Sequence, residues 1–294
     1  MSEGIQEHCV PSGTTKNDER SLFGVNGWSV IRNFISGDEL AAVRESLSAA
    51  AAQPRPACMS RPGNDLMLLR WNEPAVARVL GAKSRMQRLN AELDASGLKW
   101  LSAYISSKAP HSPPLWWHQD WWCWDHAISY RPAPTQVAVL CYLTDTSVDN
   151  GALRVLSGSH RRSMPVHALL PEPHGEEANR LPLHHPAMAD HPDQITVGVR
   201  AGDAVLLDYR LLHGTHANGS ASPRDCILLS FIVDWPHLPD ELKAHCALHP
   251  ALPRQEEAPA VAASGYAALL PQFAGMPESL QVNRRAPPIF ETTG

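Results

Sequence analysis

The sequence predicts an α+β protein with a mainly β core, a β-sandwich or barrel that follows N-terminal helices. Two observations support this fold class. Helical periodicity lies in the first third of the chain, and a series of apolar, strand-like runs separated by Gly, Asn and Asp turns follows it. Helices followed by a run of strands are typical of α+β folds and not of alternating α/β folds.

The first elements are predicted as a strand and two helices. Residues 27–34 (GWSVIRNF) alternate apolar and polar side chains, which is the pattern of a strand with one buried face. Ser36 then caps a helix over 36–52 that has acidic residues in its first turn and an apolar stripe along one side. A second helix is predicted over about 74–93.

The strands of the core come next. Residues 98–107 predict a strand, and 135–143 (TQVAVLCYL) form a continuous apolar run, as expected for a buried strand. An Asn-Gly turn at 150–151 precedes a short strand. Further strands are predicted over 194–199, 204–209 and 225–233.

The 294 residues show no composition break that would divide them into two globular domains. We expect a flexible N-terminus over 1–20, one domain over 21–235 and a Pro-rich extension over 236–294. Within the domain, residues 163–194 carry Pro, His and acidic residues with almost no periodicity. Such a stretch is typical of a functional loop or lid, unless the elements around it are misassigned.

Composition also limits the function classes. The net charge of −5 gives no electrostatic footprint for nucleic acid or for an anionic membrane. Neither a secretory signal nor an apolar run of membrane-spanning length is visible. The six cysteines are scattered, as expected for reduced thiols. We therefore expect a cytoplasmic protein that acts on a small molecule, as a monomer or a homodimer.

A first motif with chemical meaning is His118–Gln119–Asp120. Residues i and i+2 of a strand point to the same face, so His118 and Asp120 can converge on one point. Two His and one carboxylate form the facial triad that holds Fe(II) and leaves positions open for other ligands. The motif is weak on its own, because a chain with 15 histidines contains such a pattern by chance.

A second segment strengthens this interpretation. Residues 202–215 predict a strand that ends in His213, and Arg224 follows eleven residues later. The blocks GWSVIRNFISGDELAAVRESL, YLTDTSVDNGALRVLSGSH and GDAVLLDYRLLHGTHANGSASPRD occur in this order. With these blocks, the chain from about Phe23 to Trp235 resembles the phytanoyl-CoA dioxygenase-like family of Fe(II)/2-oxoglutarate oxygenases. The resemblance implies a double-stranded β-helix, a jelly-roll or cupin-like barrel, with N-terminal helices packed on one sheet.

The resemblance also implies roles for individual residues. His118, Asp120 and His213 would bind iron. Arg224 would pair with the C5 carboxylate of 2-oxoglutarate, and Thr215 would add a hydroxyl to the same carboxylate. A bidentate guanidinium that is always charged suits a buried carboxylate.

Several neighbouring residues have two interpretations. His216 competes with His213 as the third ligand, because both follow an apolar strand, but Asn218 falls on a turn asparagine of the family and favours His213. Tyr104 and Gln136 are expected to contact the cosubstrate, with plain core packing as the alternative.

The remaining histidine motifs are interpreted as structural. His160, in SGSH, is expected to shape a turn. His184, His185, Asp190 and His191 form a dense group in the 163–194 loop that could bind zinc, although a solvated lid is favoured.

The implied reaction is the oxidation, most simply the hydroxylation, of a C–H bond with Fe(II), 2-oxoglutarate and O₂. Because Asp120 keeps its carboxylate, halogenation is not expected, while desaturation, ring closure and epoxidation stay open. Two rivals remain. One is a non-catalytic cupin-like protein that binds a metal or ligand, against which Arg224 and Thr215 argue. The other is a zinc hydrolase or isomerase that uses the same triad.

The substrate is predicted only by class. Trp117, Trp121, Trp122 and Asp125, close to the metal motif, are the candidates for substrate recognition, with core packing as the alternative for each Trp. Aromatic walls favour an apolar, ring-shaped or cationic substrate. The sequence shows no basic cluster near the motif, which disfavours a CoA thioester. A secondary metabolite or an amino-acid-like compound is expected.

Overall fold

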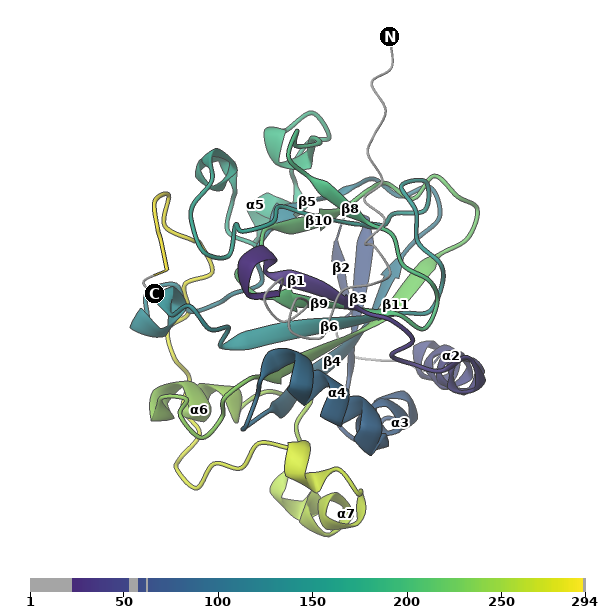
Figure 1. Cartoon of the computed structure of the whole chain (residues 1–294), viewed down its shortest axis with the longest axis vertical. Coiled ribbons are helices and arrows are strands. Elements are labelled where there is room, and N and C mark those ends of the chain that lie inside the picture. The colour runs from purple at the N-terminus through teal and green to yellow at the C-terminus, as the bar shows by residue number, and fades with distance from the viewer. Residues whose placement is uncertain (1–22, 53–57, 62, 293–294) are drawn as a thin grey trace.

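Two antiparallel sheets face one another across the core (Figure 1). The computed structural model describes residues 23–52, 58–61 and 63–292. The predicted flexible segment 1–20 lies outside these residues. In the described part of the chain the large sheet has seven strands, which run in the order β1 (Trp28–Ile31), β9 (Ala204–Asp208), β6 (Gln136–Tyr142), β11 (Arg224–Ile232), β4 (Lys99–Lys108), β3 (Asn64–Leu69) and β2 (Cys58–Arg61).

The small sheet carries four described strands. They are ordered β5 (Leu115–His118), β10 (His213–Thr215), β7 (Leu153–Val155) and β8 (Ile195–Val197). The described strand pairs of both sheets are antiparallel. Two such facing sheets form a double-stranded β-helix, so the expected fold class is confirmed.

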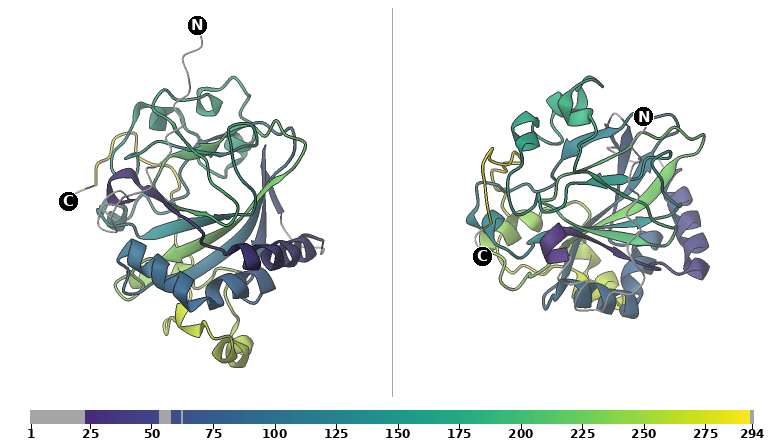
Figure 2. Two further views of the ribbon diagram at one scale, coloured as in Figure 1. Left: turned by 45° about the vertical axis from the view of Figure 1, so that its right-hand side comes forward. Right: turned by 45° about the horizontal axis from the view of Figure 1, so that its top comes forward.

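Three N-terminal helices cover the face of the large sheet that points away from the small sheet (Figures 1 and 2). They are α2 (Gly37–Ala51), α3 (Pro74–Gly81) and α4 (Lys83–Leu93). Their apolar sides, which include Val43, Val76 and Leu89, join the same core cluster as the strands. This burial explains why amphipathic sequences at these places form helices.

The beginnings and ends of these helices have local causes. The amide and the hydroxyl of Ser36 donate to the Glu39 carboxylate at 3.3 and 2.9 Å, which secures the start of α2. The single helix predicted over 74–93 is in fact two, because Ala82 has extended backbone angles. Gly81, the last residue of α3, stands at this break and is the signal that the sequence analysis did not use.

The predicted strands are present, and most of their first and last residues differ by only one or two positions from those predicted. Two differences matter for the site. The hairpin of β2 and β3 was not predicted. The continuous strand expected to end in His213 is wrong, because β9 ends at Asp208 and His213 begins β10 in the other sheet. Residues 209–212 therefore carry the chain from the large sheet to the small one.

A buried ion pair lies at this crossing. Arg210 donates to both carboxylate oxygens of Asp208, at 3.0 and 2.7 Å, and the two side chains are only 3% and 2% exposed. The guanidinium also donates to the carbonyls of Ser129 and Arg131. Burial raises the pKa of Asp208, but Arg210 outweighs that effect and the pKa falls below its usual range. The pair is therefore charged, and it fixes the crossing.

The C-terminal segment also packs on this core. Residues 236–292 contain α6 (Asp240–Cys246) and α7 (Ala258–Ala263), and the segment contributes Leu242, Tyr266 and Phe290 to the main core cluster. Its course runs from green at α6 to yellow at the C-terminal end in Figures 1 and 2.

The 163–194 loop has short helical turns, among them α5 (Glu176–Asn179). It packs beside the small sheet in a second apolar cluster that contains Trp116 and Trp117.

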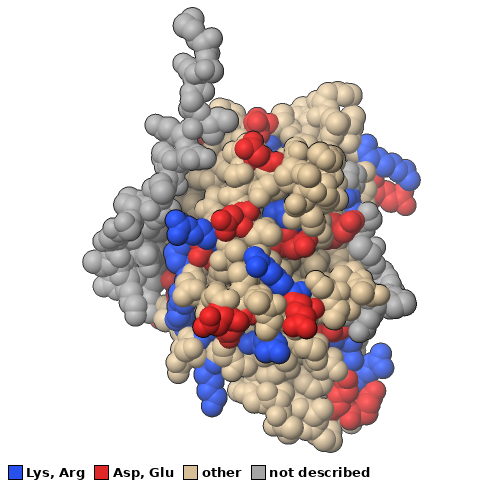
Figure 3. Space-filling model, turned by 90° about the vertical axis from the view of Figure 1, so that its right-hand side faces the viewer, with Lys and Arg blue, Asp and Glu red and all other residues tan. Residues whose placement is uncertain are grey.

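The surface carries mixed charge. Figure 3 shows acidic and basic side chains interspersed over one face of the molecule. In the described part of the chain we find no helix with both the length and the apolarity needed to cross a bilayer.

We predict that Arg210→Met lowers the free energy of unfolding by about 3–5 kcal/mol, the usual cost of leaving a buried charge without its partner. Urea unfolding followed by circular dichroism measures this loss. Arg180→Met is the control, because the Arg180–Glu176 pair is 78% and 84% exposed, and its loss should change stability by less than about 1 kcal/mol. Equal effects of the two substitutions would show that the crossing does not depend on the pair.

Candidate active site

Three side chains with metal-binding atoms converge between the two sheets. His118 ends β5 and His213 begins β10, and the two residues are direct partners in the strand register. The Nε2 atoms of His118 and His213 lie 3.7 and 3.6 Å from the carboxylate oxygens of Asp120. The ligand atoms of the three residues all lie within 4.8 Å of one another, and no other such group of His, Cys, Asp or Glu occurs among the described residues.

The backbone orients both imidazole rings. Nδ1 of His118 donates to the carbonyl of Trp116 at 2.9 Å, and Nδ1 of His213 donates to the carbonyl of Leu211 at 3.0 Å. A carbonyl only accepts, so each Nδ1 carries the proton and each Nε2 presents its lone pair toward Asp120. Metal-binding histidines are typically held in this way. Burial, together with the neighbouring His213, holds the pKa of His118 well below its usual range.

Asp120 is positioned from two sides. Its amide and that of Trp121 donate to the carbonyl of Tyr209, the residue between the two members of the buried ion pair. Its carboxylate lies 3.1 Å from Nε2 of His174. Burial raises the pKa of Asp120, but the hydrogen bond from His174 and the two other histidines outweigh it, so the pKa lies well below its usual range.

His174 was missed by the sequence analysis. It lies in the 163–194 loop, where no periodicity pointed to it, and its φ of 68° is unusual for a residue other than glycine. The contact with Asp120 compensates for this backbone strain, because strained residues persist where their surroundings hold them.

A second group of polar atoms is buried without partners. Arg224 begins β11 and is 2% exposed, and its guanidinium lies 5.4 Å from the centre of the Tyr142 ring. Nε and Nη2 of Arg224, the hydroxyl of Tyr142 and the hydroxyl of Thr215 have no hydrogen-bond partner. Thr215 shares a face of β10 with His213. Buried donors without acceptors are costly, and a carboxylate would satisfy them.

Lys108 lies beside this group. It is the register partner of Arg224, and its ammonium donates to the carbonyls of Gly63 and Pro113 at 2.8 and 2.6 Å. Burial and the charges of Arg224 and Arg154 lower its pKa to about 7. Near neutral pH, Lys108 is therefore only partly protonated and is a weaker candidate than Arg224 for pairing with a carboxylate.

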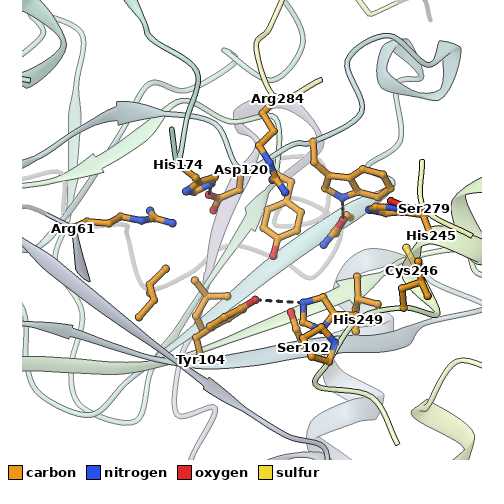
Figure 4. A pocket seen from close by; sticks show the side chains of 18 residues that line it. Arg61, Ser102, Tyr104, Asp120, His174, His245, Cys246, His249, Ser279 and Arg284 are labelled. Atoms are coloured by element: carbon orange, nitrogen blue, oxygen red, sulfur yellow. Dashed lines mark hydrogen bonds and ion pairs between the residues drawn. The ribbon is translucent and has the colours of Figure 1, made fainter. Parts of the chain in front are cut away.

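A cavity of about 590 Å³ opens beside Asp120 (Figure 4). This volume is in the usual range for small-molecule sites. Tyr104 and Gln136, the two residues expected near the cosubstrate, line it. The other polar side chains of its wall are Arg61, Ser102, Asp120, Trp122, His174, Tyr209, His245, Cys246, His249, Ser279 and Arg284.

Of the four residues predicted to recognise substrate, Trp122 lines the cavity. Its Nε1 donates to Oε1 of Gln136 at 2.7 Å, and its ring packs 4.8 Å from the ring of His245. Asp125 does not line the cavity: it accepts a hydrogen bond of 2.6 Å from the side chain of Asn283 near the surface.

Trp117 and Trp121 also lie outside the cavity wall. Trp117 precedes His118 on β5 and so points to the opposite face, where its Nε1 donates to the carbonyl of Ala189 and the Arg154 guanidinium lies 4.6 Å from its ring. Trp121 is 1% exposed and donates to Ser129. Both side chains pack in the protein interior.

The other histidines have different partners. His216 pairs with the hydroxyl of Thr196 at 2.8 Å and is not in the metal-binding group. His184, His185, Asp190 and His191 form no metal-binding group among the described residues. Nε2 of His160 contacts the carbonyl of Gly24 at 3.2 Å.

The expectation of no basic cluster near the site is wrong. Arg61 and Arg284 line the cavity although one ends β2 and the other lies in the C-terminal segment. The fold brings together residues that are far apart in the sequence, and no local pattern indicated it. The lining residue His245 lies in α6 and His249 follows the end of that helix, and no sequence pattern indicated either.

The chain matches known proteins along most of its length. The family model described as phytanoyl-CoA dioxygenase (PhyH) matches residues 23–226. An ectoine dioxygenase of Nocardia farcinica is 26% identical over a 244-residue alignment, which covers 74% of this chain and 78% of that protein. An L-proline trans-4-hydroxylase of Streptomyces griseoviridis is 26% identical over a 230-residue alignment, which covers 72% of this chain and 84% of that protein.

Solved structures show the same fold. HygX from Streptomyces hygroscopicus, with iron bound, has a TM-score of 0.55 at 20% identity, covering 76% of this chain and 87% of that one. The non-heme alpha ketoglutarate dependent epimerase SnoN from nogalamycin biosynthesis has a TM-score of 0.54 at 19% identity, covering 74% and 82%. The family match spans well over half of the sequence, and the chain belongs to the phytanoyl-CoA dioxygenase family.

Proposed function

We propose that this protein is a non-haem Fe(II)- and 2-oxoglutarate-dependent dioxygenase that oxidises, most simply hydroxylates, a C–H bond of a small molecule. The observation that carries this proposal is the convergence of His118, Asp120 and His213, with both Nε2 lone pairs facing the carboxylate. The family match and the dioxygenase and hydroxylase relatives support the same reaction class.

His118, Asp120 and His213 would hold Fe(II). Their donor set of two imidazoles and one carboxylate is the set that non-haem iron oxygenases use. Bound Fe(II), with 2-oxoglutarate and O₂, supplies the oxidising power for C–H bonds. The protein contributes the orientation of the two rings by backbone carbonyls and the charged state of Asp120. Because Asp120 is a carboxylate, halogenation is not part of the proposal.

Arg224 and Thr215, joined by Tyr142, would bind the C5 carboxylate of 2-oxoglutarate. Their unpartnered buried atoms fit an acceptor with two oxygens. Contacts of Tyr104 and Gln136 with the cosubstrate stay predictions. The amide of Gln136 is already engaged with Trp122 and Ser230, which favours a supporting role for it.

A cupin-like binding protein would not need these unpartnered donors, and a zinc hydrolase would not need 2-oxoglutarate. We also propose a cytoplasmic, secondary-metabolic enzyme, monomeric or homodimeric, without nucleic-acid or membrane partners. The location in the cytoplasm is supported by buried free thiols, those of Cys123, Cys141, Cys226 and Cys246. The mixed surface charge in Figure 3 supports the proposal of no nucleic-acid or membrane partner.

We predict that the protein, titrated without oxygen first with Fe(II) and then with 2-oxoglutarate, develops the visible charge-transfer band of their chelate. His213→Ala should abolish the band and His216→Ala should keep it, because only His213 faces Asp120. Absorption spectroscopy measures the band, and circular dichroism checks folding. Loss of the band in His216→Ala with retention in His213→Ala would reverse the ligand assignment, and a folded wild type without any band would contradict the oxygenase proposal.

We predict that Arg224→Met raises the dissociation constant for 2-oxoglutarate at least about tenfold, the loss expected for one charge-assisted hydrogen bond or more. Fe(II) binding, followed by the electron paramagnetic resonance of its nitric oxide adduct, should be unchanged. Arg200→Met, at an exposed position, is the control. An unchanged dissociation constant in Arg224→Met would remove Arg224 from the site.

A further inference from the structure

The wall of the cavity beside Asp120 carries two cations. Arg61 is 7% exposed, and its Nε has no hydrogen-bond partner. Arg284 enters from the C-terminal segment, and Figure 4 shows the side chains of Arg61 and Arg284 reaching into the cavity from different sides. Burial raises the pKa of Tyr104, and the charges of Arg284 and Arg61 oppose that rise, so both cations act on this part of the cavity.

A single carboxylate among the described lining residues, that of Asp120, acts on Arg61. This carboxylate faces His118, His213 and His174. A metal ion held by Asp120 would neutralise its charge further. Burying a charge without a partner is costly, so the cavity favours a ligand that supplies negative charge.

The neutral side chains of the wall present donors. Nδ1 of His249 accepts the amide hydrogen of Ala251 at 3.2 Å, so Nε2 carries the proton and donates to the Tyr104 oxygen at 3.3 Å. His249 therefore does not take the hydroxyl hydrogen of Tyr104, whose other hydrogen-bond neighbour is Ser102. Burial lowers the pKa of His249 to about 4, so its ring is neutral at pH 7.

His245 is held in the same manner. Its Nδ1 accepts the amide hydrogen of Leu280 at 3.0 Å, which leaves an N–H donor at Nε2. Its ring packs against Trp122, an apolar surface beside the donors. Burial and the charge of Arg284 lower its pKa, so it too is a neutral donor.

We propose that the substrate is a small anion whose carboxylate or other oxyanion group is bound by Arg61 and Arg284, with Tyr104 and His245 as further donors. This inference rests on the proposed function and names its substrate class. The apolar part of the substrate would lie against Trp122. The cationic substrate that aromatic walls alone would favour is disfavoured by two guanidiniums and the lack of a free carboxylate.

The residues of this anion site lie partly outside the family match. The match ends at residue 226, whereas His245, His249 and Arg284 follow it. Substrate recognition therefore depends on a segment of the chain that the match to the family does not include.

The test uses the holoenzyme with Fe(II) and 2-oxoglutarate, without oxygen. Four probes of similar shape are titrated: benzoate, phenylphosphonate, neutral benzamide and cationic benzylammonium. Perturbation of the charge-transfer band and tryptophan fluorescence report binding. We expect at least one anion to bind about 10- to 100-fold tighter than benzamide, as for charge-assisted hydrogen bonds. The tighter of the two anions identifies the oxyanion group, carboxylate or phosphonate.

Variants assign the preference to residues. Arg284→Met should bring the anions to the affinity of benzamide, while Arg285→Met, at the exposed neighbouring position, should keep the preference. Neither variant should change the 2-oxoglutarate titration of the band. Arg61→Met should act like Arg284→Met, and because Arg61 is buried, Arg284→Met decides the question if Arg61→Met does not fold.

Three results would overturn the proposal: no preference for an anion over benzamide, tighter binding of benzylammonium, or a weaker 2-oxoglutarate titration in Arg284→Met of the size expected for Arg224→Met. Failure of the proposed function would look different. The band would then be absent from the wild type, and fluorescence titration of the metal-free protein would still show whether Arg284 confers a preference for anions.

Discussion

The Asp208–Arg210 ion pair holds the point at which the chain leaves the large sheet for the small one. His213 begins its strand three residues after Arg210, and the carbonyl of Tyr209 receives the amide of Asp120. His213, at the start of β10, and Asp120, just after β5, are thus both positioned by this crossing. The pair can do this because both charges are satisfied: Arg210 donates to the carboxylate and to backbone carbonyls of the 129–131 turn.

The site is arranged for ligands before they bind, and part of this arrangement destabilises the ligand-free protein. Each triad imidazole is oriented by a carbonyl two residues before it, so both rings are already turned toward a metal site. Around Arg224, by contrast, buried donors lack acceptors. Desolvation of these donors destabilises the ligand-free fold. A bound carboxylate would accept hydrogen bonds from them, so binding of the carboxylate would also stabilise the folded protein.

Local patterns and long-range assembly were not equally predictable from the sequence. The HxD spacing of His118 and Asp120 and the spacing of His213 and Arg224 matched a family, so these residues could be named in advance, although β5 ends at His118 and Asp120 lies just beyond the strand that was expected to carry both. Arg61, His174 and Arg284 could not, because each lies in a hairpin, loop or tail without periodicity, and only the tertiary fold makes them neighbours. Trp117 is a case in which closeness in sequence misleads. It directly precedes His118 and was therefore a candidate for the same pocket, but neighbouring residues of a strand point to opposite faces, so Trp117 points away from it.

The C-terminal segment has a consequence for how the chain can be divided. The family match ends inside β11, a strand with neighbours on both sides in the large sheet, and Leu242, Tyr266 and Phe290 belong to the same apolar core as the strands. The segment that matches the family is therefore shorter than the segment that folds as one core. A fragment cut at the boundary of homology would split a central strand and expose the core, so the barrel and the C-terminal segment have to be expressed as one chain.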